Sequence, residues 1–491
     1  MSNRHGTSNL FKVFEKNKRP RTEALFSMLR RLHQPENATL LRTVREKSGV
    51  GKIDVSQKFG RLFSSRTEQV ELFPKEKLEQ LAEAMFRGHD GHDTGVPIGF
   101  AFLGQFIDHD ITLDATTQLG RVAGDVSEIE NFRTPRLDLD SVYLGGPEAS
   151  PYLYQRKRSG HGPELLVGTT DNPFDVQRLP DKTAIIGDPR NDENIFISQM
   201  QSLFIRFHNH VVELVEECQI HKTEESTFEQ AKNICRWVYQ WIVVNEFLPA
   251  IVDEDVLAPY IEGFHNSQLP GPINWESQPF ITVEFSAAAY RFGHSLIRQD
   301  YRLNNIVAGD LFAFPPFSPV EQYKNIDWKY LLNFGDNKHQ SAKAIDTILP
   351  EALRVLPFIP ENDVPNLAAR NMIRGQHTFE LLTGEEAAAK FEVTPIDKHP
   401  LVQQYGLEHT PLWFYVLAEA ESRGGKLGTV GGGIVAGTLL RLILADETSY
   451  INAEAAKGFD PHKILAVDPD NINSVFAEMA RKVSTNVSTN N

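Results

Sequence analysis

Polar side chains interrupt an otherwise apolar run at GQFIDHD, residues 104–110. If this run is a helix, Gln105, Asp108 and His109 share one face through their i, i+3 and i+4 spacing. Asp110 lies roughly 100° away around the same helix, because the helical period is about 3.6 residues. Burying polar side chains without partners is costly, so these residues indicate either a polar cavity or a partly exposed helix end.

Two further segments bring charged side chains and a histidine next to apolar helical patterns. In GDPRNDEN (187–194), Arg190 and Glu193 are three residues apart at the start of a long helical pattern and can share a face. In AAAYRFGH (287–294), His294 follows a glycine, and Arg291 precedes it by one turn. A single histidine in such a place is more often a packed core residue than a ligand, but the repeated pairing of charge and apolar helix favours a cavity.

These three segments, in this order, resemble those of the animal haem peroxidases of the peroxidase-cyclooxygenase superfamily. Members of that family carry Gln-x-x-Asp-His on the distal side of the haem and Arg-x-Gly-His on the proximal side. The resemblance extends over roughly residues 95–445, includes the later LAARNMIRG and GTVGGGIVAGTLLRLI, and is similar in style to the bacterial members. It implies a mainly α fold, a large helical haem-peroxidase domain with long irregular loops and little β structure.

The resemblance implies a haem b-derived cofactor that is held mainly from the proximal side. His294 is expected to be the ligand of the haem iron. Asn371 is expected to bond the other ring nitrogen of His294 and so to fix its orientation. Arg291 is expected to pair with a haem propionate.

On the distal side, the resemblance gives three residues a role in cleaving hydrogen peroxide. His109 would take a proton from the peroxide and return it to the leaving oxygen. Arg190 would stabilise the developing negative charge, and Gln105 would hold distal water. The implied activity is a haem peroxidase that reduces hydrogen peroxide and oxidises small donors through a ferryl intermediate.

Covalent attachment of the haem and the choice of donor follow from the same resemblance. Asp108 and Glu193 match the carboxylates that form ester bonds to haem methyl groups. Asn194 stands where strongly oxidising members carry a methionine bonded to a haem vinyl group. We therefore expect bromide, iodide, thiocyanate or phenols as donors rather than chloride.

A calcium site is the second cofactor that the resemblance implies. In RTPRLDLDSVY (133–143), the expected ligands are Thr134, the carbonyl of Arg136, Asp138 and Asp140, and Asp110 joins them from the distal helix. LDLD alone would be better explained as a solvated acidic turn. The position of Asp110 beside His109 favours the ion.

Two alternative functions stay open. Fatty-acid dioxygenases of the same superfamily use a tyrosine three residues before the proximal histidine, but here that residue is Arg291, and Tyr290 is rotated by about 100°. An interaction or adhesion protein that keeps the fold is the other alternative. The sequence has no RGD tripeptide and retains all the distal and proximal groups, which disfavours that reading.

Composition excludes several partner classes. The formal net charge of -15 would repel nucleic acid, so HNH at 208–210 is interpreted as two helix-face histidines, His208 and His210, one packed and one solvated. With only two cysteines, Cys218 and Cys235, no disulfide framework is expected and both should be buried thiols. The sequence shows no signal-peptide pattern and no long apolar run, so no membrane span is expected; a cytoplasmic location and leaderless export are both compatible with it. The oligomeric state is not specified.

The elements that must position these residues are mostly helical. Apolar residues recur with the helical period at 193–219, 227–252, 285–297, 364–375 and 410–424. Between them, the Pro- and Gly-rich segments 133–192 and 300–335 are expected to wrap the surface or bind something. We expect an N-terminal extension at 1–75 with a helix at TEALFSMLRRLH, a catalytic domain at 76–480 and a flexible tail at 481–491.

Overall fold

The computed structural model describes residues 58–64, 73–89, 91–114, 117–157, 160–217, 225–272, 279–357, 359 and 363–484. The expected helix at TEALFSMLRRLH and most of the expected tail lie outside these residues. The boundaries of the extension, the domain and the tail therefore stay predictions. Within the described residues the fold is mainly helical, with short two-stranded pairs, as expected.

The α-helices are α4 (Lys75–Glu83), α5 (Gly99–Ile111), α6 (Asp140–Tyr143), α7 (Gly146–Ala149), α8 (Ile195–Glu216), α9 (Thr227–Ile242), α10 (Leu248–Ile251), α11 (Glu254–His265), α12 (Val283–Ala287), α13 (Leu367–Ile373), α14 (Gly384–Lys390), α15 (Pro400–Gln404), α16 (Leu412–Ser422), α17 (Thr429–Ala445), α18 (Pro461–Ile464) and α19 (Val475–Ser484). Two π-helical turns are η6 (Val243–Phe247), which continues α9, and η11 (Arg374–Thr378), which continues α13. The 3₁₀ turns are η3 (Val126–Glu128), η4 (Pro151–Leu153), η5 (Pro189–Asp192), η7 (Ala289–His294), η8 (Gln322–Lys324), η9 (Trp328–Tyr330), η10 (Glu351–Leu353), η12 (Glu454–Ala456) and η13 (Pro469–Asn471).

Among the described residues, the strands form four separate two-stranded pairs. Strand β1 (Phe59–Gly60) runs parallel to β5 (Ile281–Thr282). The other three pairs are antiparallel: β2 (Asp93–Pro97) with β8 (Ser341–Lys343), β3 (Tyr154–Lys157) with β4 (Gly160–Leu165), and β6 (Asp300–Arg302) with β7 (Ala308–Asp310).

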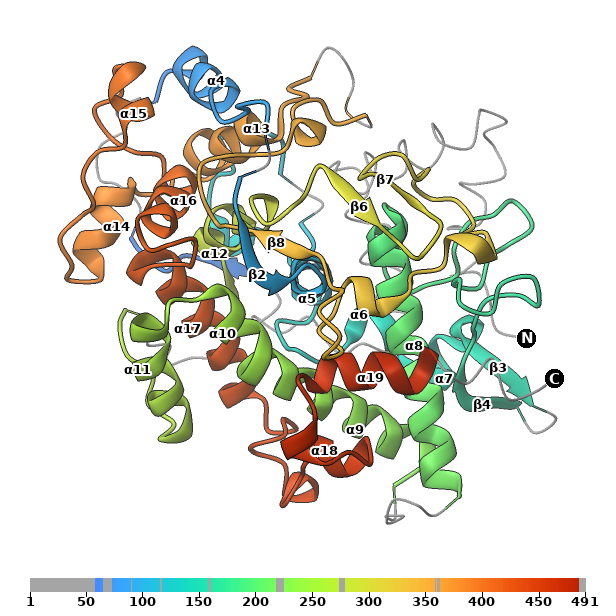
Figure 1. Cartoon of the computed structure of the whole chain (residues 1–491). Coiled ribbons are helices and arrows are strands. Elements are labelled where there is room, and N and C mark those ends of the chain that lie inside the picture. Colours follow the sequence, from blue (N-terminus) through green and yellow to red (C-terminus); the bar gives the residue numbers. More distant parts are fainter. Residues whose placement is uncertain are drawn as a thin grey trace, which may run out of the picture.

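One connected hydrophobic core surrounds the central helices. In Figure 1, α5 lies near the centre of the view, with α8 to its right and α12, α16 and α17 to its left. Helix α5 packs against α8 and against η7, so the two histidine-bearing segments are neighbours. The core runs from Phe59 to Val483 and includes residues of all these helices. No helix among the described residues has the length and apolar character needed to cross a bilayer.

Helix α5 begins at a position where only glycine fits. A Cβ on Gly99 would lie 2.5 Å from Leu332 Cδ2 and 2.8 Å from the carbonyl oxygen of Leu331. The Gly99 amide donates to that same carbonyl at 2.8 Å. The close approach of the two backbones therefore fixes where α5 starts.

The long helix after GDPRNDEN begins later than its sequence pattern predicts. Asn194 is the N-cap of α8, and its side-chain oxygen accepts a hydrogen bond from the amide of Ile197 at 2.9 Å. Arg190 belongs to η5, and Glu193 ends it. Both charged residues thus lie in the turn before the helix, not on its face.

The segment that carries His294 is not one continuous helix either. Helix α12 ends at Ala287, and Ala288 leaves the helical region with φ -133° and ψ -77°. The chain then continues as the 3₁₀ turn η7, which ends at His294. An alanine-rich run gives no signal for such a break, because alanine favours the helix.

Candidate active site

His109 is held at the buried end of α5 in a neutral state. Its Nδ1 lies 2.7 Å from Asn191 Oδ1, and its Nε2 lies 3.8 Å from Glu193 Oε1. Burial, reinforced by the positive charge of Arg190, lowers the pKa of His109 to about 4. A neutral imidazole at this position can accept a proton from a bound substrate.

Gln105 and Glu193 lie next to His109, as their sequence pattern predicts. Gln105 Nε2 donates to Glu193 Oε1, and Asn194 Nδ2 donates to Gln105 Oε1 at 3.4 Å. Burial raises the pKa of Glu193 to about 7, although Arg190 opposes this shift. This environment therefore favours the protonated form of the carboxyl group more than water does.

Arg190 is close to His109 but bonds to its backbone rather than to its ring. Its Nη2 donates to the carbonyls of His109 at 3.0 Å and Thr112 at 2.7 Å. Its Nε and Nη2 also donate to the two carboxylate oxygens of Asp188 at 3.1 and 2.8 Å. The guanidinium group thus fixes the C-terminal end of α5.

Asp188 and Asn191 are two residues of this site that the sequence pattern did not identify. Burial alone would raise the pKa of Asp188, but Arg133 and Arg190 lower it well below its usual range. Asn191 is completely buried against His109. Their only sequence signal is the polar run GDPRND, which is also typical of an ordinary turn.

On the other side of the site, His294 is paired with Asn371 as expected. Asn371 Nδ2 lies 2.9 Å from His294 Nδ1, and a 180° rotation of the amide would place its oxygen there instead. Enclosure by the protein, together with Arg291, lowers the pKa of His294 to about 3. The imidazole is therefore neutral, which is the form that can bind a metal.

Open space adjoins His294. The histidine and Arg291 both keep partial solvent exposure despite their interior position. A Cβ built on Gly293 would meet no atom within 4 Å. These residues therefore border an open space, which is called the cavity below, rather than fill the core.

Positive charge gathers beside this cavity. Arg291 donates from Nε to the carbonyl of Ser286 at 2.9 Å. Burial, with repulsion from Arg374 and Arg370, lowers its pKa to about 10. Burial also lowers the pKa of Arg374, although Asp114 opposes this shift. An anionic ligand with two carboxylates would complete such a cluster.

Asp108 and Tyr290 approach the cavity from the two facing segments. Asp108 Oδ1 accepts a hydrogen bond from Thr112 Oγ1 at 2.9 Å. The hydroxyl of Tyr290 is buried without a hydrogen-bond partner and lies 4.0 Å from where a Cβ on Gly104 would be. Burial, with the nearby charge of Asp108, raises the pKa of Tyr290 well above its usual value. Tyr290 thus reaches towards α5, whereas Arg291 bonds within its own segment.

Comparison with known proteins identifies the family. Residues 127–378, slightly more than half of the chain, match the animal haem peroxidase model. The chain belongs to the animal haem peroxidase family. The chorion peroxidase of Drosophila melanogaster is 28% identical over 355 residues, which are 66% of this chain and 42% of that protein. The chain thus spans less than half the length of this relative.

Two solved structures have a similar fold. Peroxidase A from Dictyostelium discoideum aligns with a TM-score of 0.61 at 16% identity, over 88% of this chain and 93% of that one. Fatty acid alpha-dioxygenase from Oryza sativa aligns with a TM-score of 0.57 at 15% identity, over 97% and 94% of the two chains. At these identities the likeness shows the fold alone.

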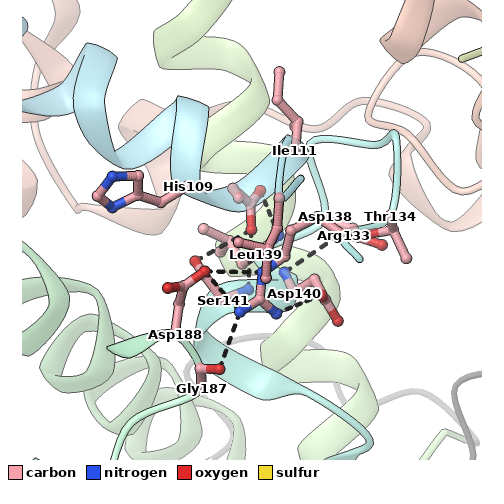
Figure 2. A network of polar contacts seen from close by, with 12 residues as sticks. His109, Ile111, Arg133, Thr134, Asp138, Leu139, Asp140, Ser141, Gly187 and Asp188 are labelled. Carbon is pink, nitrogen blue, oxygen red and sulfur yellow. Dashed lines mark hydrogen bonds and ion pairs between the residues drawn. The ribbon is translucent and has the colours of Figure 1, made fainter. Parts of the chain in front are cut away.

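The loop that was expected to bind calcium folds back onto α5 (Figure 2). Asp110 is fully buried and accepts hydrogen bonds from the amides of Leu139 and Ser141, each at 3.1 Å. Thr134 Oγ1 donates to Asp138 Oδ1 at 2.8 Å. Within LDLD itself, Asp140 is buried and Asp138 is partly buried, so this segment is not a fully solvated acidic turn.

The carboxylates of this loop repel one another. Burial and the charge of Asp138 raise the pKa of Asp110 well above its usual value. Burial and the charge of Asp140 raise the pKa of Asp138 to about 6. Lys232 and Arg236 oppose the shift at Asp138, so nearby positive charge offsets part of this repulsion.

Arg133 supplies positive charge next to Asp140, as Figure 2 shows. Its guanidinium group donates to Asp140 at 2.9 Å, to Asp188 at 2.6 Å and to the carbonyl of Gly187 at 3.1 Å. Asp140, one of the expected calcium ligands, is thus already paired with an arginine. The side chain of Arg136 is exposed. In the part of the chain that the structure describes, no group of three or more His, Cys, Asp or Glu side chains is arranged to hold a metal ion.

Two further histidines and one cysteine have the burial that the sequence predicts. His208 is fully buried between Tyr143 and Pro163, and His210 keeps partial exposure. Cys235 is a buried free thiol whose pKa burial raises to about 12. Cys218 lies outside the described residues.

Proposed function

We propose that this chain is a haem peroxidase that reduces hydrogen peroxide and oxidises small donors. The observation that carries the proposal is a pair of neutral imidazoles, His109 and His294, on two packed segments with open space beside the second. Family membership and the match to chorion peroxidase support the same reading.

The residues around the cavity fit haem. His294 would bind the iron through Nε2, with Asn371 presenting its amide oxygen to Nδ1. Arg291 and Arg374 would pair with the propionates, which explains why two guanidinium groups lie close together there. Bound haem would supply the redox-active iron for the reaction.

The distal residues would handle the protons. His109 Nε2 would accept a proton from hydrogen peroxide and pass it to the leaving oxygen, so that water departs. Arg190 would hold the end of α5, and with it His109, in place. Gln105 and Glu193 would border the peroxide on the other side of the imidazole.

The decisive experiment substitutes His109 and His294 one at a time and measures haem binding and peroxidase activity. We expect purified protein with haem to show a Soret band and to oxidise guaiacol, iodide or thiocyanate when peroxide is added. His294→Ala should abolish stable haem uptake, because it removes the iron ligand. His109→Ala should keep the Soret band but lower the rate of peroxide cleavage by roughly 10² or more.

The experiment has a control variant and two outcomes that would contradict the proposal. His89→Ala changes an exposed histidine and should alter neither property. A protein that stays colourless with added haemin would end the proposal. Full haem loading without oxidation of any donor would instead favour the interaction protein.

Covalent haem attachment is a finer part of the proposal. Asp108 precedes His109 in α5, and Glu193 Oε1 lies 3.8 Å from His109 Nε2. Both carboxylates would form ester bonds to the haem. Pigment should therefore stay with the polypeptide after extraction with acid and acetone. Asp108→Asn combined with Glu193→Gln should release it, while either single variant should retain one link.

The presence of asparagine at position 194 restricts the donors that we expect the protein to oxidise. It lies beside Gln105 at the edge of the site and cannot form a sulfonium bond. Bromide, iodide, thiocyanate and phenols would be oxidised, and chloride would not. Steady-state assays with each donor at one peroxide concentration test this ranking.

Calcium binding is proposed for the loop around Asp110 and Asp138. Its support is the mutual repulsion of these carboxylates together with the oxygen donors of Thr134 and Arg136. Asp140 would have to share its carboxylate with Arg133. Luminescence of bound terbium, excited through nearby aromatic rings, should appear and be displaced by calcium. Asp138→Asn should weaken it, and an absence of any saturable signal would refute the site.

A fatty-acid dioxygenase is the second candidate. The fold likeness to the Oryza sativa enzyme and the buried hydroxyl of Tyr290 near α5 favour it. Incubation with linoleate and oxygen, without peroxide, separates the two activities. A peroxidase should consume no oxygen under these conditions, and oxygen uptake that is lost in Tyr290→Phe would establish the dioxygenase.

A further inference from the structure

We propose that Asn191 and Gln201 are positioning residues that form an amide relay, which keeps the proton of neutral His109 on Nδ1 and leaves Nε2 as an acceptor. All three side chains lie in the interior, and Asn191 and Gln201 are fully buried. The inference depends on the proposed function only for the use that is made of Nε2.

The direction of the relay is set at its far end. Gln201 Nε2 lies 3.5 Å from the carbonyl oxygen of Ser141, which can only accept a hydrogen bond. The amide nitrogen of Gln201 must therefore face Ser141. The opposite orientation would bring two oxygens together.

Each following contact is then determined. With its nitrogen towards Ser141, Gln201 presents Oε1 to Asn191, whose Nδ2 donates to it at 2.8 Å. Asn191 in turn presents Oδ1 to His109 Nδ1 at 2.7 Å. Because this oxygen can only accept, Nδ1 carries the proton, and Nε2 of the neutral ring has the lone pair.

The carbonyl that starts the relay is itself fixed. Ser141 donates from its amide and from Oγ to Asp110, at 3.1 and 3.3 Å. Asn191 is anchored at its backbone, where its amide donates to the carbonyl of Asp188 at 3.0 Å. No rotation of a single amide can therefore reverse the relay without breaking a buried hydrogen bond.

Leucine at position 191 should reverse the tautomer. An Nδ1–H that faces leucine would be buried without an acceptor, which is unfavourable. The proton would then move to Nε2, which faces Glu193 Oε1 at 3.8 Å. Aspartate at position 191 keeps an acceptor oxygen and should leave the proton on Nδ1.

The test is nitrogen-15 NMR of the full chain with labelled histidine. It is recorded on the haem-loaded ferrous form with carbon monoxide, which is diamagnetic, and on the haem-free chain. The signal of His109 is identified by its loss in His109→Ala. We expect the directly bonded proton on Nδ1 in the wild type and in Asn191→Asp, and on Nε2 in Asn191→Leu and in Gln201→Leu.

A second readout measures whether Nε2 accepts a proton. Hydrogen cyanide gives up its proton when it binds haem iron, so its association rate at pH 7, followed by the shift of the Soret band, depends on Nε2. Asn191→Leu should lower this rate by about tenfold or more, because the base is lost. Asn191→Asp should restore most of it.

Gln199→Leu is the matched control. Gln199 is a buried glutamine of the same helix, α8, and it donates to the carbonyl of Phe174 at 2.9 Å instead of joining the relay. It should change neither the tautomer nor the cyanide rate. A wild-type proton on Nε2, an unchanged tautomer in Asn191→Leu, or a reversed tautomer in Gln199→Leu would overturn the relay. If the chain binds no haem, the proposed function fails, while the haem-free spectra still decide the tautomer.

Discussion

Asp188 is a shared anionic partner of two buried guanidinium groups. It bonds Arg133 and Arg190 at the same time, and it is fully buried. Arg133 continues to the loop at Asp140, and Arg190 continues to the carbonyls at the end of α5. One carboxylate therefore connects the loop around Asp110 with the helix that carries His109.

Asp188→Asn should be strongly destabilising. The substitution removes the negative charge and leaves two guanidinium groups buried without their main partner. We expect the free energy of unfolding to fall by about 3–5 kcal/mol, the usual cost of breaking a buried ion pair. Urea unfolding followed by circular dichroism measures it. Asp171→Asn, in an exposed turn, should change it by less than about 0.5 kcal/mol; an equal effect of both variants would contradict this role.

At the residue scale, the sequence predicts the histidines better than it predicts what holds them. The family resemblance names His109, Glu193, His294 and Asn371, and the structure places Glu193 beside His109 and Asn371 beside His294. Their roles stay predictions. Asn191 and its partners could not be assigned, because the contacts with Gln201 and Ser141 depend on the tertiary packing of η5, α8 and α6. No local pattern distinguishes such an amide from any other polar residue in a turn.

At the scale of elements, His208 ties α8 to two neighbours. Tyr143 of α6 donates to its Nδ1 at 3.1 Å, and its Nε2 donates to the carbonyl of Pro163 in β4 at 2.8 Å. Burial lowers the pKa of His208 to about 4 from its ordinary value of 6.5. The folded protein therefore stays unprotonated here over a range in which the unfolded chain takes up a proton.

This difference predicts a pH-dependent stability. As pH falls from 6.5 to about 4, only unfolded His208 gains a proton, so its contribution to stability is lost over that range. The difference in unfolding free energy between the wild type and His208→Gln should shrink by up to about 3 kcal/mol. Urea titrations at pH 7, 6, 5 and 4 measure the difference. A difference that stays constant across these pH values would refute the assignment.

Helix α17 depends on glycines for its close contacts. A Cβ on Gly432 would lie 2.8 Å from Val252 Cγ1 and 3.1 Å from the carbonyl oxygen of Leu427. Gly432→Ala should therefore destabilise the protein by about 1–3 kcal/mol through overpacking, despite the higher helix propensity of alanine. Thermal unfolding measures the loss. Gly375→Ala, where the nearest atom would be 3.5 Å away, should be tolerated, and equal tolerance of both would contradict the packing argument.

Helical periodicity predicts most of the long helices but not where they are interrupted. The run 285–297 has an unbroken apolar pattern, yet it changes at Ala288 from α12 to the 3₁₀ turn η7. The start of α8 at Ile195 depends on the cap formed by Asn194. Periodicity of apolar residues carries no information about either feature.

At the scale of the whole molecule, one connected core joins elements from both ends of the described chain. Residues from Phe59 to Val483 belong to it. Near the C-terminal end, Glu246 accepts hydrogen bonds from Ser474 Oγ at 2.8 Å and from the amide of Phe476 at 3.2 Å, which holds the start of α19. Such a structure should unfold as a unit.

Calorimetry tests this expectation. The haem-free protein should show a single transition with a calorimetric enthalpy close to the van't Hoff enthalpy. Glu246→Gln should lower the melting temperature without splitting the transition. Two separated transitions would show that the region between residues 76 and 480 contains more than one folding unit.

Helix α5 presents Asp108, His109 and Asp110 to three different partners, which are Thr112, Asn191 and Ser141. Inserting or deleting one residue within this helix would turn everything beyond that point by about 100° and put a carboxylate where the imidazole belongs. Relatives that share this site should therefore differ in α5 by substitution at constant length, while gaps and insertions gather in the surrounding loops.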